Sequence, residues 1–170
     1  MPNLDDILRR VQGVQDGLQG GELPRLAVLP YGDRIVELQR EQLAEGKAAS
    51  GEDLRPYYSE DIKPTGYFHS TATAANYAAW KQTINNPYEA GARNPDAPNL
   101  FITGKFYGEI GVEFGSDRAR IVALTPFAAQ VMAKYGADAF GLTFGRWMLI
   151  MRDEGGLERL IDEIKQVIYG

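Results

Sequence analysis

The sequence predicts an α+β fold, in which several helices pack on a small antiparallel β-hairpin. Three observations favour this class: helical spacing of apolar residues near both ends, one segment of alternating apolar residues, and a turn that leads into a second apolar run. The chain has 170 residues, of which 44% are hydrophobic and 24% charged, as is typical of one globular domain. We expect a single domain over residues 1–170, with a helical part over 1–46, a long loop region over 47–99, and a hairpin with C-terminal helices over 100–170.

The N-terminal part predicts two helices. Apolar residues recur every three or four positions over Asn3–Leu18, with aspartates in the first turn and two glycines after the end. Pro24 and Pro30 predict that the next stretch is extended. A second helix is expected over Asp33–Glu45, and Gly46 is placed to end it.

Residues 47–99 resemble a loop for most of their length, with one short helix expected over Thr73–Ile84. A compact domain rarely contains so long a loop, so either elements escape detection or another chain orders the segment. Its aromatic residues argue against a disordered linker. Aromatic residues are enriched at protein interfaces, and we expect Tyr58 and Trp80 to anchor one, with packing inside the subunit as the alternative for Trp80. The candidate interface residues are Tyr57, Tyr58, Tyr67, Phe68 and Trp80.

The second half predicts strands. Leu100–Thr103 is expected to be a short strand. Apolar and other residues alternate over Glu109–Phe114, the turn-forming segment Gly115–Asp117 follows, and Arg120–Leu124 returns. This pattern predicts a β-hairpin.

Three helical segments should follow the hairpin. Thr125 is a suitable N-cap before a helix over Pro126–Tyr135, and a glycine follows that helix. A helical stretch from Thr143 through Arg152 comes next, and then the most regular apolar pattern of the chain, over Leu157–Tyr169.

The helices after the hairpin are expected to cover it. The face of the first strand that carries Ile110, Val112 and Phe114 is the expected counterpart of the apolar stripe on the last helix. Ile161 lies in that stripe, so we expect Ile161→Asp to cost several kcal/mol through burial of an unpaired carboxylate.

Composition excludes several classes of chemistry. The absence of cysteine excludes disulfides, thiol nucleophiles and zinc sites with cysteine ligands. The single histidine, His69, excludes sites with several histidines. A lone histidine in a loop is more often a surface residue than a general base. The net charge of −5 disfavours nucleic-acid binding.

No membrane or secretory segment is expected. The longest fully apolar run, Trp147–Met151, is far shorter than the roughly 20 residues that span a bilayer. The first ten residues contain two acids and lead into no apolar segment, unlike a signal peptide.

Carboxylates supply the remaining candidates for catalysis. Acidic pairs at positions 5–6, 52–53, 60–61 and 153–154 could hold Mg²⁺, although adjacent acids in loops and first turns usually favour the helix dipole or solubility. The glycines at 104, 108, 111 and 115 lack the spacing of a phosphate-binding loop. We therefore expect no catalytic residue, no cofactor and no metal.

Three segments, in order along the chain, resemble those of a known family. The first comprises Leu38–Leu43, Gly46, Ser50–Leu54 and Tyr57–Ser59; the second is Leu100–Tyr107; the third is Lys134–Gly136 with Ala139–Thr143. Their order and spacing are similar to those in small head–tail connection proteins of long-tailed bacteriophages, of the tail-completion or minor-tail type.

The resemblance implies a structural protein of the virion neck or tail, assembled in the cytoplasm of the bacterial host. It implies a homo-oligomeric ring that joins head and tail, contacts neighbouring neck, tail or portal proteins, and lets DNA pass without any membrane partner. An acidic ring repels the duplex, which suits a conduit. The residues alone also leave open a protein-binding adaptor or regulatory module and, less favoured, a small metal-dependent nuclease.

Overall fold

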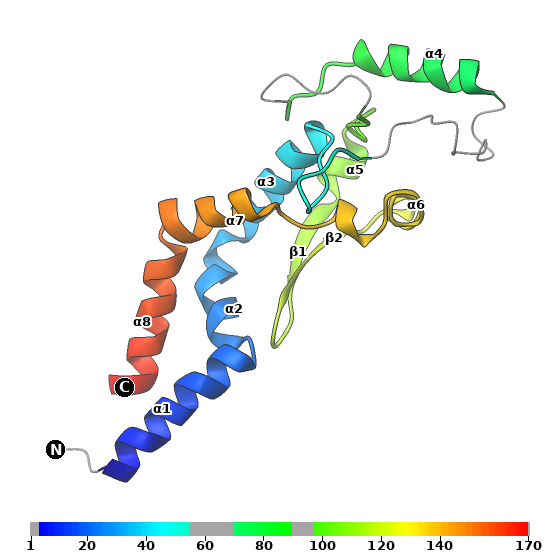
Figure 1. Ribbon diagram of the computed structural model, residues 1–170. Coiled ribbons are helices and arrows are strands. Elements are labelled where there is room, and N and C mark those ends of the chain that lie inside the picture. Colours follow the sequence, from blue (N-terminus) through cyan, green and yellow to red (C-terminus); the bar gives the residue numbers. More distant parts are fainter. Residues whose placement is uncertain (1–3, 55–69, 90–96, 170) are drawn as a thin grey trace. The chain divides into compact units, whose positions relative to one another are not determined.

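The structure is a computed structural model that describes residues 4–54, 70–89 and 97–169 (Figure 1). Contacts divide the chain into two compact units. Unit 1 comprises residues 1–36, 111–122 and 145–170, and unit 2 comprises residues 37–110 and 123–144. The helices and strands are, in order, α1 (Leu4–Gln19), α2 (Glu22–Val28), η1 (Leu29–Tyr31), α3 (Gly32–Ala44), α4 (Thr71–Gln82), α5 (Lys105–Gly108), β1 (Ile110–Phe114), β2 (Ala119–Ala123), α6 (Pro126–Tyr135), η2 (Ala137–Ala139), α7 (Phe144–Met148), the π-helical turn η3 (Leu149–Asp153) and α8 (Gly156–Tyr169).

The predicted α+β class is confirmed, because the described helices accompany a two-stranded sheet formed by β1 and β2. The strands are antiparallel and joined by a tight turn, in which the Gly115 amide donates to the Arg118 carbonyl at 2.8 Å. At the open end of the hairpin the Leu124 amide donates to the Glu109 carbonyl at 3.2 Å. The expected hairpin is therefore present.

Helix ends follow the signals in the sequence. α6 begins where expected because the Thr125 side chain accepts a hydrogen bond from the Phe127 amide at 3.1 Å. α4 has Ser70 as its N-cap, whose hydroxyl accepts from the Thr73 amide at 3.2 Å. Gly46, just beyond α3, has a φ of 73°, a conformation that favours glycine. The expected helices near both ends are also present.

The extended stretch predicted around Pro24 is wrong, because α2 occupies it and η1 follows. Pro24 is the third residue of α2, where the backbone N–H has no partner within the helix, so a proline is tolerated. The Pro30 ring likewise lies in the first turn of η1. Two prolines therefore mark helix starts here.

The strand predicted over Leu100–Thr103 is also wrong. Leu100 has a φ of 53°, and the Phe101 amide donates to the Asn99 side chain at 3.2 Å. This side-chain turn replaces strand pairing, and α5 begins at Lys105.

In unit 1, α8 packs against α1 and α2, not on the hairpin as predicted. Ile161 is 43% exposed, so its assignment to the core is wrong, and Ile161→Asp is expected to cost far less than a core substitution. Gly17 lets α1 approach α2 closely, since a Cβ at this position would lie 2.9 Å from the Leu23 side chain, whereas a Cβ at Gly13 would lie 3.4 Å from Val167, in ordinary contact.

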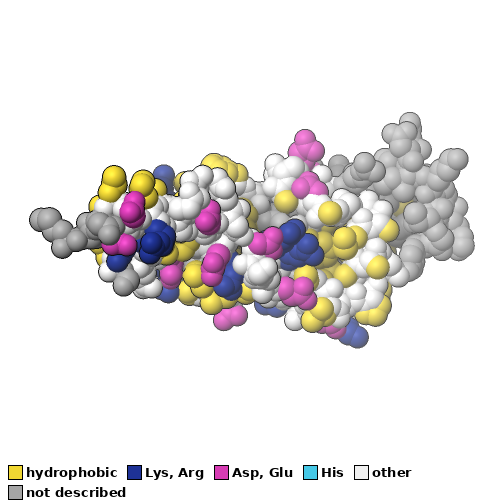
Figure 2. All heavy atoms as spheres, turned by 90° about the horizontal axis from the view of Figure 1, so that it is seen from below, with side chains coloured by type: hydrophobic (Ala, Val, Ile, Leu, Met, Phe, Trp, Pro, Cys, Tyr) yellow, Lys and Arg dark blue, Asp and Glu magenta, His cyan; other side chains and the backbone are white. Residues whose placement is uncertain are grey.

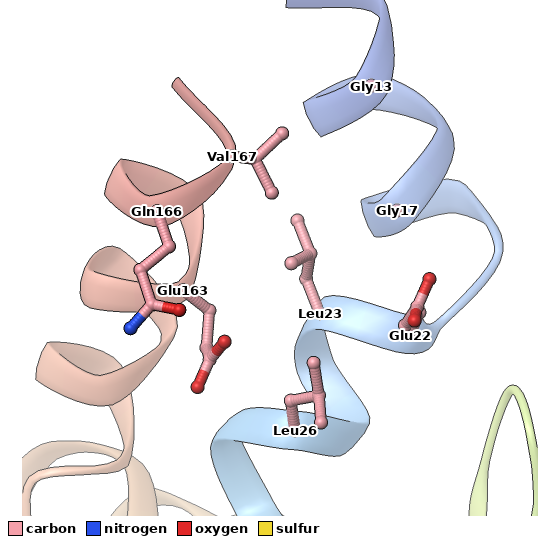
Figure 3. A pocket seen from close by; sticks show the side chains of 8 residues that line it. All are labelled: Gly13, Gly17, Glu22, Leu23, Leu26, Glu163, Gln166 and Val167. Atoms are coloured by element: carbon pink, nitrogen blue, oxygen red, sulfur yellow. The ribbon is translucent and has the colours of Figure 1, made fainter. Parts of the chain in front are cut away.

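A small cavity of about 270 Å³ separates these three helices (Figure 3). Leu23 and Val167 point toward one another across it, while Gly13 and Gly17 form the wall on α1.

None of the described helices combines the length and apolar character that a bilayer-spanning segment needs.

Candidate functional site

The most tightly built part of unit 2 joins α3 to the segment after α6. Gln39 and Gln42 on α3 have no exposed surface. The Gln39 side chain donates to the Ala139 carbonyl at 3.1 Å and accepts from the Gly141 amide at 2.9 Å. The Gln42 side chain donates to the Gly141 carbonyl at 2.7 Å and accepts from the Thr143 amide at 2.8 Å. Two side-chain amides thus pair with backbone as a neighbouring strand would.

This arrangement brings together two of the segments that carry the family resemblance. Leu38–Leu43 and Ala139–Thr143 are about 100 residues apart in the chain, yet both glutamines of the first segment bind the backbone of the second. The Ala49 amide, in the loop after α3, donates to the Asp138 carbonyl at 2.8 Å. The third motif is therefore held between α3 and that loop.

A second group of contacts in unit 2 holds α5. Tyr107 is fully buried, and its hydroxyl donates to the Asn99 carbonyl. Arg40 on α3 donates to the Tyr107 carbonyl at 2.7 Å. The ring of Tyr88 stacks on Tyr107 with 5.2 Å between centroids, and Phe101 contacts the same ring edge-on at 5.3 Å. Aromatic packing therefore fixes the segment 97–108.

A cavity of about 860 Å³ lies beside this segment within unit 2. It is bounded by α4, by the segment from Leu100 through α5, and by α6. Its size falls in the range of ligand and peptide pockets, and most of its wall is apolar. The apolar wall includes Leu100, Ile102, Phe106, Phe127 and Val131.

Lysines and tyrosines provide most of the polar part of this wall. Among the lysines that the structure describes, Lys81, Lys105 and Lys134 line the cavity, although the chain as a whole is acidic. Lys81 is buried, Lys134 is half-buried and Lys105 is exposed at the rim. No carboxylate belongs to the described part of the lining. We call it the lysine-lined cavity.

Burial changes the proton affinity of several lining groups. It lowers the pKa of Lys134 below its usual value and raises the pKa of Tyr77. Burial also raises the pKa of Tyr135, and the nearby Tyr77 adds to the increase. Both phenols therefore keep their protons at neutral pH and remain hydrogen-bond donors.

Sequence reasoning found this site only in part. Trp80, an expected interface anchor, lies on α4 with 48% of its surface exposed, and its ring is 5.5 Å from that of Tyr77 in the cavity wall. Lys134 and Tyr135 stood out only as part of a motif. The sequence does contain a pattern that points to the α6 part of the cavity wall, since Phe127, Val131 and Lys134 share one face of α6 at helical spacing. The other interface candidates (Tyr57, Tyr58, Tyr67, Phe68) and His69 lie outside the described residues.

Unit 1 presents a second candidate surface on α1. Leu4 and Leu8 are 71% and 57% exposed, and none of the side chains of α1 is buried. Leu4, Ile7, Leu8 and Val11 share one face at helical spacing, and Figure 2 shows hydrophobic side chains at the surface over this helix among charged ones. We call these four residues the α1 stripe.

The α1 stripe lies where the helix extends past α8. Arg10 donates to the Ile168 carbonyl near the end of α8, and Gly13 faces Val167. The first two turns of α1 therefore continue beyond the last turn of α8 (Figure 1).

Within residues 4–54, 70–89 and 97–169, no three acidic or histidine side chains gather into a set that could hold a metal ion. Comparisons with models of protein families, with curated proteins and with solved structures find no match to this chain.

Proposed function

We propose that this chain is a structural subunit of a homo-oligomeric ring in the neck or tail of a long-tailed bacteriophage, where it joins head and tail around the DNA passage. The observation that carries the proposal is the α1 stripe: four apolar side chains at helical spacing, all exposed in the isolated chain. Contiguous apolar surface of this kind is typical of a protein–protein contact.

Unit 2 supports the same proposal with apolar surface of its own. Leu124, Phe127 and Phe144 are each more than half exposed. Aromatic residues at the surface are typical of interfaces and their energetic centres. Both units thus present apolar side chains that further subunits or neighbouring neck proteins would cover.

The motif segments support the choice of assembly. The segments around residues 38–43 and 139–143 form one hydrogen-bonded structure, as expected if their shared order reflects a common subunit scaffold. The net charge of −5 suits a ring that lets DNA slide through without gripping it.

Mass spectrometry of purified tailed-phage particles from cells that express this chain tests the proposal. We expect the chain in the particles at the copy number of a symmetric ring, and in a neck or tail fraction after mild dissociation. Particles that lack the chain, although it is abundant in the same cells, would overturn the proposal.

A further inference from the structure

We draw no further inference here: the strongest candidate, the lysine-lined cavity bounded by α4, α5 and α6 in unit 2, carries no proposal, because two of its lysines, Lys81 and Lys134, already have partners and nothing in the structure shows what occupies it.

Discussion

The helices α1 and α3 have similar sequence patterns but very different surroundings. Both are amphipathic, yet Leu38 and Leu43 of α3 are 1% and 0% exposed, whereas Leu4 and Leu8 of α1 are 71% and 57% exposed. Apolar periodicity therefore identifies a helix and its apolar face, but it does not say whether the same chain covers that face.

Polar contacts explain much of the difference. Gln39 and Gln42 fix α3 to the backbone of residues 139–143, a segment about 100 residues further along the chain. α1 approaches its neighbours through Gly13 and Gly17 on another face, so its apolar stripe is left outward. The apolar face of α3 therefore contributes to the core, whereas that of α1 remains at the surface of the chain.

The largest difference in stability should be between a substitution at the buried Leu38 and one at the exposed Leu8. Leu38→Ala removes buried methyl groups and leaves a cavity, so we expect the free energy of unfolding to fall by about 2–5 kcal/mol. Leu8→Ala in the α1 stripe should change it by less than about 0.5 kcal/mol. Urea unfolding at a concentration where both variants are monomeric measures the contrast; equal losses would mean that α1 is covered within its own chain.

Replacing one glutamine should show how much its hydrogen bonds contribute to the free energy of unfolding. Gln42→Met keeps the approximate shape but takes hydrogen bonds from the Gly141 carbonyl and the Thr143 amide, at an expected cost of about 2–4 kcal/mol. Gln12→Met, at an exposed glutamine of α1, is the control and should stay within about 0.5 kcal/mol. Parent-like unfolding of Gln42→Met would show that apolar packing alone holds the segment.

An effect confined to alkaline pH should come from the cavity wall. The pKa of Tyr135 is raised in the folded chain, so above about pH 10 the unfolded chain releases a proton that the folded chain retains. The contribution of the Tyr135 phenol to the free energy of unfolding should therefore be complete below about pH 10 and decrease as the pH rises further. Tyr135→Phe should make this fall less steep; denaturant unfolding between pH 8 and 11 compares the slopes, and identical slopes would contradict the burial of this phenol.

The smallest effect concerns the close approach of α1. Gly13→Ala places its Cβ in ordinary contact with Val167 and should raise the free energy of unfolding by up to about 1 kcal/mol, because alanine favours helices. Gly17→Ala has the same helical benefit, but its Cβ would lie 2.9 Å from the Leu23 side chain. We expect a lower melting temperature for Gly17→Ala than for Gly13→Ala, and the reverse order would show that Leu23 moves aside freely.

Local signals in the sequence determined most element boundaries. Thr125 and Pro126 set the start of α6, and Gly136, with a φ of 79°, follows its end. The alternation of apolar residues over Glu109–Phe114, together with the turn segment Gly115–Asp117, predicted the position of the β-hairpin. These signals succeed because helix caps, proline geometry and glycine conformations act within a few residues. Where a local rule permits two outcomes, as at Pro24, the prediction failed, since proline suits both extended chain and the first helical turn.

Tertiary structure alone decided which faces are covered and where the cavity lies. Contacts between Gln39 and Ala139, or between Tyr88 and Tyr107, depend on residues far apart in the chain, and no local pattern specifies them. The sequence marked Trp80 as an interface candidate and Lys134 as part of a motif, but only the fold of unit 2 places Lys81, Lys105 and Lys134 around one cavity. Ile161 shows the same limit, because an apolar stripe fixes a helical face while its neighbours determine its burial.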